Sequence, residues 1–453
     1  MHARLQKRRQ ATVSLALLLA ALAPSGWPLA AEPSLNPAAA RRTAVVEVFE
    51  RWSGSVVFLA GPMFKVRNPS LEEFFNVPGE PSPQSSVGSG FIVHESGYVV
   101  VNAHAAEKVI YPEVSLSDGR TYRAELVASA HEEDVALVKI DAGRPLAPVK
   151  LAKSGDLLIG ETVIVIAHPH GLRHTCTAGV ISAVGRSSKI LDIQDLTLHN
   201  LIQTDAGINP GSSGGPWFNV LGEVIGLTAS KQQDADNIGF AIAAETIRRL
   251  LPEMLDVHRR YGLASGLAVA ADGSCRVTAV EPDSPGVHAS IRPDDVLKVV
   301  GGRATPTALD FHLALVGRKP HETLDVVLDR QGESVETSLV LGQRPEPNTE
   351  ALLREKLGLA AAPLAQKTAD AMRLLLPYGV VLTAVDADRY NAIEHKPLPG
   401  DVLARVGRIR PRDMEHLGLI LERVAPGESV RLVVLRVQGK TATRIDIQLA
   451  VPK

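Results

Sequence analysis

The segment Asn209-Pro210-Gly211-Ser212-Ser213-Gly214-Gly215-Pro216 places one serine, Ser213, in a run of glycines. A serine between glycines lies on a tight turn without bulky neighbours. The backbone N–H groups of Gly211 and Ser213 can then point at one place and stabilise a developing oxyanion. Such a turn serves acyl transfer when a general base reaches the Ser213 hydroxyl. The segment therefore predicts a nucleophilic serine.

Two upstream segments supply the partners that a nucleophilic serine needs. An apolar strand that begins at Gly97 ends at His104, and Asp134 opens a second apolar strand. Each residue by itself has an ordinary interpretation, as a strand-end histidine, a turn aspartate or part of a flexible glycine-serine loop. Their order, His104, Asp134 and Ser213, is that of chymotrypsin-like double β-barrels. We therefore predict a catalytic triad.

The chain resembles the HtrA/Deg serine proteases over residues 86–245. The similar elements are Gly88-Ser89-Gly90-Phe91-Ile92, Asn102-Ala103-His104, Asp134-Val135-Ala136, Ile202-Gln203-Thr204-Asp205-Ala206, the serine segment, Gly222-Glu223-Val224-Ile225-Gly226 and Ile238-Gly239-Phe240-Ala241-Ile242. The chain departs from the family at Ser212, at Ala103 and at Ala167-His168-Pro169-His170. Because residue 212 is expected to contribute through its backbone, serine in place of the usual asparagine should leave the oxyanion hole intact.

The resemblance implies a secreted or periplasmic serine endopeptidase that cleaves unfolded or damaged envelope proteins. Ser213 is then the nucleophile, His104 the general base and Asp134 the group that orients the imidazole. Gly211 and Ser213 form the oxyanion hole. Ile208, five residues before the serine, is expected to line the primary specificity pocket and favour a small aliphatic side chain. A homo-oligomer is also implied, with trimers built through the protease domain.

Composition excludes several other classes of protein. A chain of 453 residues suits about two to four domains, and its apolar content of 45% is that of a globular protein. The 48 basic and 50 acidic side chains nearly cancel, and no basic block indicates a nucleic-acid partner.

Two cysteines, Cys176 and Cys275, fall in different predicted domains, so we expect thiols rather than a disulfide.

No metal or cofactor is expected, because a serine peptidase of this kind requires none. His168, His170 and His174 lie close together in the sequence. They have no cysteine or carboxylate partners on the same predicted loop that would complete a zinc site.

The first 31 residues have the layout of a secretory signal peptide. Basic residues precede an apolar run from about Ala11 to Ala23, and Leu29-Ala30-Ala31 provides small residues for cleavage. The apolar run is short for a membrane span, although an uncleaved anchor is the alternative. Residues 32–42 are then a flexible mature N-terminus, located outside the cytoplasm.

The next part of the chain predicts a mostly β protease domain over residues 43–260. Short β-branched runs alternate with turn residues, as in barrels and sandwiches. Between Ala243 and Arg260, apolar residues recur at helical spacing, which predicts a connecting helix that Pro252 breaks or kinks.

Beyond this helix the sequence repeats itself. The segments Pro293-Asp294-Asp295-Val296-Leu297 and Pro399-Gly400-Asp401-Val402-Leu403 correspond at a spacing of 106 residues. Such a repeat indicates two domains of one kind, residues 261–344 and 351–453, joined by a polar, proline-bearing linker.

Both repeats resemble PDZ domains, which have an α+β fold and bind peptides with free apolar C-termini by strand addition. The resemblance implies a carboxylate-binding loop at Gly266 and Leu267 in the first repeat and at Gly358 and Leu359 in the second. The second loop fits the apolar-Gly-apolar pattern better, whereas the first glycine is also compatible with a simple turn.

Two further classes of function remain open at this stage. The chain could be a protease-like chaperone or scaffold in which peptide binding dominates and cleavage is minor. It could also be a structural envelope protein that uses its repeats for partner binding alone.

Overall fold

The computed structural model describes residues 41–61, 85–107, 109, 112–152, 154–168, 175–189, 197–231, 237–270, 274–365, 379–438 and 441–452. The predicted signal peptide lies outside these residues, as does most of the predicted flexible N-terminus. By internal contacts the chain divides into residues 1–43 and 44–453, and the second of these carries all the elements below. Within the described ranges, no helix is both long and apolar enough to cross a bilayer.

The first barrel is closed, with the strand order β1-β2-β3-β6-β5-β4. Its strands are β1 (Val56–Gly61), β2 (Ser85–His94), β3 (Tyr98–Val101), β4 (Glu113–Ser115), β5 (Thr121–Ala130) and β6 (Val135–Ile140). Strand β3 is buried along its whole length, which explains its uninterrupted apolar sequence. The β-branched residues Val57, Val99 and Val138 belong to one buried cluster of this barrel.

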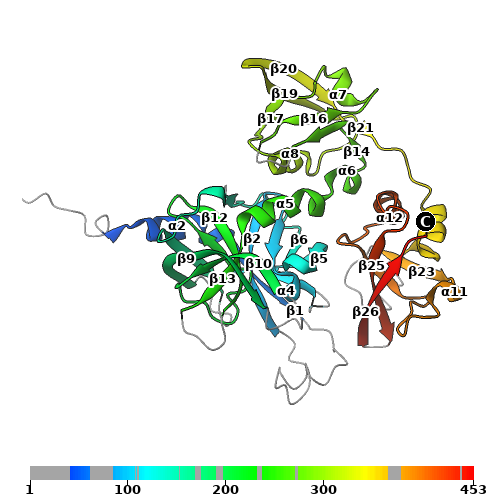
Figure 1. Ribbon diagram of the computed structural model, residues 1–453, viewed down its shortest axis with the longest axis horizontal. Coiled ribbons are helices and arrows are strands. Elements are labelled where there is room, and N and C mark those ends of the chain that lie inside the picture. The colour runs from blue at the N-terminus through cyan, green and yellow to red at the C-terminus, as the bar shows by residue number, and fades with distance from the viewer. Residues whose placement is uncertain are drawn as a thin grey trace, which may run out of the picture. The chain divides into compact units, whose positions relative to one another are not determined.

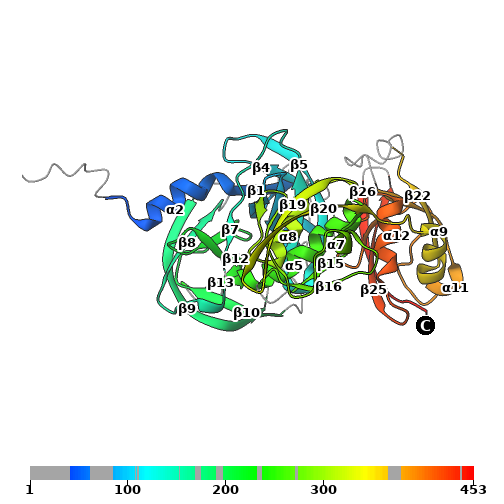
Figure 2. The ribbon, with the colours of Figure 1, turned by 90° about the horizontal axis from the view of Figure 1, so that it is seen from above.

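The second barrel has the strand order β11-β8-β9-β10-β13-β12-β7, and a further β11–β12 pairing closes it. Its strands are β7 (Lys150–Leu151), β8 (Thr162–Ala167), β9 (Thr175–Lys189), β10 (Thr197–Thr204), β11 (Pro216–Phe218), β12 (Glu223–Lys231) and β13 (Gly239–Ala243). Trp217 is fully buried in it. The expected chymotrypsin-like double barrel is therefore confirmed (Figures 1 and 2).

The connecting helix differs from the sequence prediction. Two helices, α5 (Ala244–Leu255) and α6 (Val257–Arg260), replace the single helix, and the break falls at Asp256 rather than at Pro252. Pro252 lacks only its own N–H donor, and its carbonyl still accepts the Asp256 N–H at 3.3 Å. The chain leaves the helix at Asp256 because this residue adopts a left-handed conformation, with φ of 43°.

Two β-rich units follow, which we call the first and second C-terminal units. The first contains β14 (Leu263–Ala264), β15 (Leu267–Val269), β16 (Val277–Val280), α7 (Pro285–His288), β17 (Val296–Val300), β18 (Arg303–Ala304), α8 (Ala308–Leu315), β19 (Thr323–Arg330), β20 (Glu333–Val340) and β21 (Gly342–Gln343). The second contains α9 (Thr349–Leu352), a π-helical turn (Leu353–Leu357), β22 (Leu359–Pro363), β23 (Val380–Val385), α11 (Ala387–Tyr390), β24 (Val402–Val406), α12 (Met414–Glu422), β25 (Ser429–Gln438) and β26 (Thr441–Ala450).

The sequence repeat is accompanied by an arginine–aspartate ion pair that recurs at the same positions in both units. Arg330 makes a bidentate pair with Asp295, at 2.8 and 2.7 Å, and Arg436 does the same with Asp401, at 2.9 and 2.8 Å. The partners in both pairs are related by 106 positions. The aspartate of each repeat is therefore held by an arginine on a later strand, β19 or β25, and this pairing fixes the turn that begins β17 or β24.

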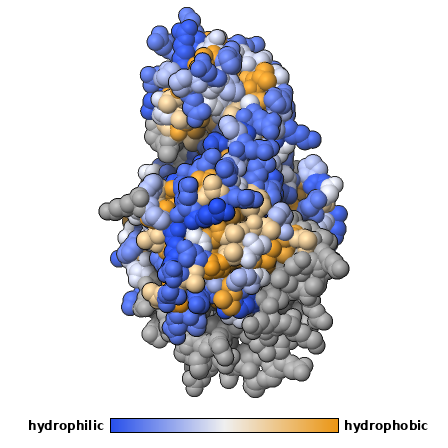
Figure 3. All heavy atoms as spheres, turned by 90° about the vertical axis from the view of Figure 1, so that its right-hand side faces the viewer, coloured by the Kyte–Doolittle hydropathy of each residue, from blue (hydrophilic) through white to orange (hydrophobic). Residues whose placement is uncertain are grey.

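The cores of these units are organised differently. One buried cluster runs from the barrels through α5 and α6 into the first C-terminal unit, and a separate cluster fills the second. Cys176 and Cys275 are both free thiols, as expected. On the face shown in Figure 3, hydrophilic and hydrophobic residues are interspersed, in keeping with the balanced composition.

Candidate active site

The structure brings the predicted base and its carboxylate into direct contact. His104 lies on the short helix α4 (Ala103–Glu107), directly after β3, and Asp134 directly precedes β6. The His104 Nδ1 atom is 2.8 Å from Asp134 Oδ2 and 3.0 Å from Oδ1. Strands β3 and β6 are neighbours in the barrel, so their ends carry the two residues to the same point.

The Asp134 carboxylate is held from several sides. It is fully buried and accepts hydrogen bonds from the His104 backbone N–H at 2.9 Å and from the Asn102 side-chain amide at 3.0 Å. Its backbone is left-handed, with φ of 54°, a conformation that aspartate tolerates better than most residues. These contacts leave the carboxylate one orientation, toward the imidazole.

The Ser213 turn is built as the glycine pattern predicted. Gly211 and Gly214 have φ of 90° and 83°, and a Cβ atom on Gly214 would collide with the Ser89 carbonyl oxygen. The Gly214 N–H donates to the Thr228 carbonyl at 2.9 Å, which ties the turn to β12. Ser213 itself is half-buried.

The serine turn lies next to the elements that carry the base. A Cβ atom on Gly88 would lie 2.9 Å from the Ser213 carbonyl oxygen and 3.8 Å from the Ala105 Cβ. The serine turn and helix α4 therefore both lie close to Gly88. Within the described residues, however, no hydrogen bond joins the Ser213 hydroxyl to the His104 ring. Such catalytic contacts often tighten only when substrate binds.

The backbone N–H groups of the turn differ in whether they are already engaged. The Ser212 N–H donates to the Asn209 carbonyl at 2.9 Å. Among the described residues, no acceptor takes the N–H of Gly211 or Ser213. The N–H groups of Gly211 and Ser213, which the sequence analysis singled out, are thus available to a ligand, whereas the Ser212 N–H is used within the turn.

Sequence reasoning noted Ser89 only as part of a motif, and the structure gives it a definite place. This buried serine on β2 donates its backbone N–H to the Ser213 carbonyl at 2.7 Å and its hydroxyl to the Gly211 carbonyl at 2.9 Å. Its hydroxyl accepts the His168 N–H at 2.9 Å. Ser89 therefore joins the first barrel to the serine turn, and its flanking glycines were the available signal.

A buried ion-pair network at Glu107 was not anticipated. Glu107 is three residues after His104 on α4 and pairs with Arg405 at 2.5 Å and Arg444 at 3.0 Å. It also accepts from Ser129. Burial alone would raise the pKa of Glu107, but these partners and His131 hold it well below its usual range. Nothing in the local sequence marks Glu107 as different from any other helical glutamate.

Ile208 is partly buried and packs against strand β13. A Cβ atom on Gly239 would lie 3.4 Å from the Ile208 Cβ, so the two residues are in close contact. Ile208 also packs on the apolar cluster of the second barrel. This position, just before the serine turn, is compatible with the expected wall of a specificity pocket.

The two predicted peptide-binding loops differ in the availability of their donors. In the second unit the Gly358 N–H already donates to the Arg354 carbonyl at 3.1 Å. In the first unit the Gly266 carbonyl accepts from Glu281, while no described acceptor takes the Gly266 N–H. In the first loop the next N–H, that of Leu267, donates to Ser265 Oγ at 3.3 Å. The glycine N–H is therefore engaged in the second loop, where it ends the preceding helical turn, and has no described acceptor in the first.

Of the three histidines considered for zinc, His168 alone lies within the described residues. His168 is buried behind the serine turn, whereas His170 and His174 lie outside the described residues. No cluster of three or more metal-binding side chains occurs in the part of the chain that the structure describes.

Comparison with known proteins adds independent support. A family described as a trypsin-like peptidase domain matches residues 88–227. The chain is 30% identical over 412 residues to the "Probable periplasmic serine endoprotease DegP-like" of Chlamydia trachomatis, covering 84% of this chain and 81% of that protein. It is 31% identical over 366 residues to the "Periplasmic serine endoprotease DegP" of Salmonella typhimurium, covering 76% and 73%. A solved structure, "HtrA-type protease AlgW with decapeptide", is 26% identical and covers 67% of this chain and 100% of its own, with a TM-score of 0.41.

The double barrel, the trypsin-like match and these relatives define a serine endopeptidase. More narrowly, the chain belongs to the DegP/HtrA family of serine endoproteases, since the resemblance extends over 84% of its length.

Proposed function

We propose that this protein hydrolyses unfolded or damaged proteins of the cell envelope through a triad of His104, Asp134 and Ser213. The observation that carries the proposal is the buried Asp134 carboxylate, held 2.8 Å from the His104 ring beside the Ser213 turn. A buried carboxylate on an imidazole next to a half-buried serine is the arrangement that peptide hydrolysis requires.

Each group has a role that follows from its contacts. Asp134 accepts the Nδ1 proton of His104, so that Nε2 is left as the base that takes the Ser213 proton during attack on the peptide carbonyl. The imidazolium then returns this proton to the leaving amine. The N–H groups of Gly211 and Ser213 stabilise the tetrahedral oxyanion, each worth about 3 kcal/mol in comparable sites.

The surrounding features complete the proposal. Ile208 lines the primary specificity pocket and favours a small aliphatic residue, and the C-terminal units bind peptides with free C-termini. The protein acts in the periplasm or outside the cell after removal of residues 1–31, as a homo-oligomer. The relatives named periplasmic endoproteases support the location.

One competing function is a chaperone or scaffold in which peptide binding dominates and cleavage is minor. Ser213→Ala separates the two. We expect the variant to lose cleavage of casein and labelling by a fluorophosphonate, with an unchanged unfolding temperature. If wild-type protein is not labelled under conditions in which it binds unfolded substrate, the scaffold function is correct.

The location is tested at the N-terminus of the native protein. Sequencing should give a start near Glu32, in an extracytoplasmic fraction, because the apolar run and its small residues provide a cleavage site. A native start at Met1 in the membrane fraction would show an uncleaved anchor instead.

A further inference from the structure

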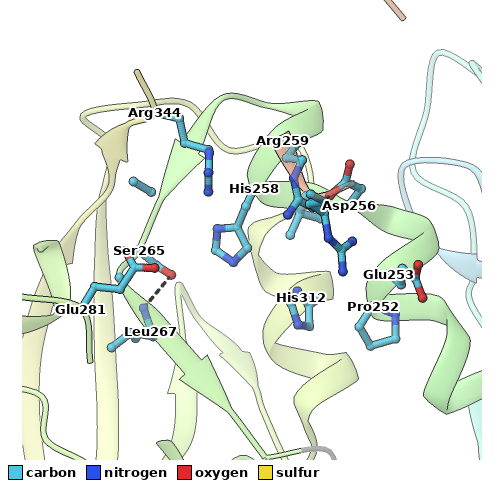
Figure 4. A pocket seen from close by; sticks show the side chains of 14 residues that line it. Pro252, Glu253, Asp256, His258, Arg259, Ser265, Leu267, Glu281, His312 and Arg344 are labelled. Carbon is cyan, nitrogen blue, oxygen red and sulfur yellow. Dashed lines mark hydrogen bonds and ion pairs between the residues drawn. The ribbon is translucent and has the colours of Figure 1, made fainter. Parts of the chain in front are cut away.

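A pocket of about 320 Å³ lies at the predicted peptide loop of the first C-terminal unit. One wall is the loop Ser265-Gly266-Leu267 between β14 and β15, and His312 of α8 lies beside it. The opposite wall is helix α6, which contributes His258 (Figure 4). The pocket thus belongs to the connecting helix as well as to the unit that follows it.

The pocket lies where the last residue of an added peptide strand would end. Strand β15 pairs with β16 on one side, and its other edge has no partner strand in the described part of the chain. A peptide that adds to this edge runs toward the Gly266 N–H and stops there. Its terminal side chain then falls between Leu267 and His312.

Several buried polar atoms in this pocket have no hydrogen-bond partner among the described residues. They include two donors, Arg344 Nε and Arg259 Nε, and also His312 Nδ1, which donates when it carries a ring proton. The carboxylate that pairs with Arg344 is that of Glu422, at 3.9 Å. An apolar side chain would displace water and leave these donors unpaired, whereas a carboxylate would accept from them.

The acidic side chains of the pocket do not cancel these donors. Asp256 is already engaged by Arg259 at 2.5 Å and by His416 at 3.3 Å. Glu253 reaches Arg408 at 3.5 Å, and Glu281 is exposed at the mouth, where solvent screens it. Figure 4 shows the His258 ring in the middle of the pocket, with Arg344 extending toward it.

We propose that this pocket selects an acidic C-terminal residue, so that the first C-terminal unit binds peptides ending in aspartate or glutamate. The inference rests on the proposed peptide-binding role and departs from the expectation that both units take apolar C-termini. The main-chain carboxylate meets the Gly266 loop, and the side-chain carboxylate meets Arg344 and His312.

The same geometry makes binding depend on pH. Burial lowers the pKa of His258 and of His312 to about 4. Positive neighbours act in the same direction, since Arg344 and Arg259 face His258, and His258 faces His312, while Asp256 opposes both shifts. A bound carboxylate favours the protonated rings, so binding takes up protons and tightens as the pH falls below neutral toward the pKa of about 4 that the free rings have.

The test uses full-length Ser213→Ala protein and fluorescence anisotropy. Labelled decapeptides identical except for a final Glu, Gln or Leu are compared, together with the Glu peptide as a C-terminal amide. We expect the Glu peptide to bind at least about tenfold more tightly than the Gln and Leu peptides, the factor for one charge-assisted hydrogen bond. Arg344→Gln should remove this preference without weakening the Leu peptide.

Arg292→Gln is the matched control, because Arg292 is an exposed arginine of the same unit outside the pocket. It should leave the preference intact. His312→Gln carries the test if Arg344→Gln lowers the unfolding temperature, and it should also reduce the pH dependence. Equal or tighter binding of the Leu peptide, or a preference that survives both pocket variants, would overturn the inference. Binding that is unchanged by amidation, or that is absent for every peptide, would overturn the proposed peptide role itself.

Discussion

Replacement of Asp134 by asparagine changes one atom of the proposed site and should be nearly as damaging as removing the nucleophile. The carboxylate is fully buried and its three neighbours are all donors: the His104 ring at 2.8 Å, the His104 backbone at 2.9 Å and the Asn102 amide at 3.0 Å. Asparagine has one acceptor and one donor in this place, so its amide group must face a donor. His104 can relieve the conflict by moving its proton to Nε2, where it can no longer act as a base.

The size of the effect follows from this tautomer switch. A wrong tautomer in such a triad costs a factor of about ten thousand in turnover, or about 5 kcal/mol of transition-state stabilisation. The assay is kcat/KM for a fluorogenic peptide and for casein, with fluorophosphonate titration to count active sites and circular dichroism to show that the fold persists.

The neighbouring Glu133 offers a matched control. Its carboxylate is 21% exposed and pairs with Arg408 at 3.1 Å and Arg249 at 3.4 Å, away from the imidazole. Glu133→Gln should therefore change turnover only a few-fold, in line with the small energies of exposed pairs. Turnover of Asp134→Asn within tenfold of wild type, or a larger loss for Glu133→Gln, would refute the assignment.

Three further predictions concern other parts of the structure. Gly214→Ala should abolish activity and lower the unfolding temperature, because the new Cβ atom would collide with the Ser89 carbonyl and because φ of 83° disfavours alanine. Gly143→Ala is the control, since Gly143 also has a positive φ but has open space around it. Glu107→Gln should lower the free energy of unfolding by about 3 kcal/mol or more at neutral pH, since Arg405 loses its buried partner. The pKa of Glu107 is lowered on folding, so this deficit should shrink as the pH falls below about 4; a deficit that is constant with pH would contradict it. Burial and the charges of Arg303 and Lys139 lower the pKa of His94 in the folded protein to about 4. As the pH falls from about 6.5 to 4, this histidine is protonated in the unfolded chain but not in the folded one, so the free energy of unfolding should decrease over that range. His94→Gln should flatten that part of the curve in denaturant titrations, and an unchanged slope would show that His94 is not the group responsible.

The residues of the proposed triad and the barrels could be predicted because their signals are local. A glycine-framed serine, a histidine after a buried strand and an aspartate before another are patterns within a few residues of each position. The repeat could also be found in the sequence, since Asp295 and Asp401 recur with their strands, and the structure pairs each aspartate with an arginine at the corresponding position of its own repeat. The helix break was predicted at Pro252 because proline commonly interrupts helices. It lies instead at Asp256, which adopts a left-handed conformation.

By itself, the sequence determined the class of fold, the tight glycine turn at Ser213 and the duplication of the C-terminal units. Strand periodicity, turn glycines and repeats are all properties of the sequence pattern itself. Only the tertiary structure decided which distant residues meet. Ser89 reaches Gly211 across 122 positions and Arg405 reaches Glu107 across 298. The basic pocket at His258, His312 and Arg344 has the same origin, since one helix, a second helix and the segment after β21 each contribute one side chain. Such contacts depend on how the elements pack, and no short stretch of sequence encodes that packing.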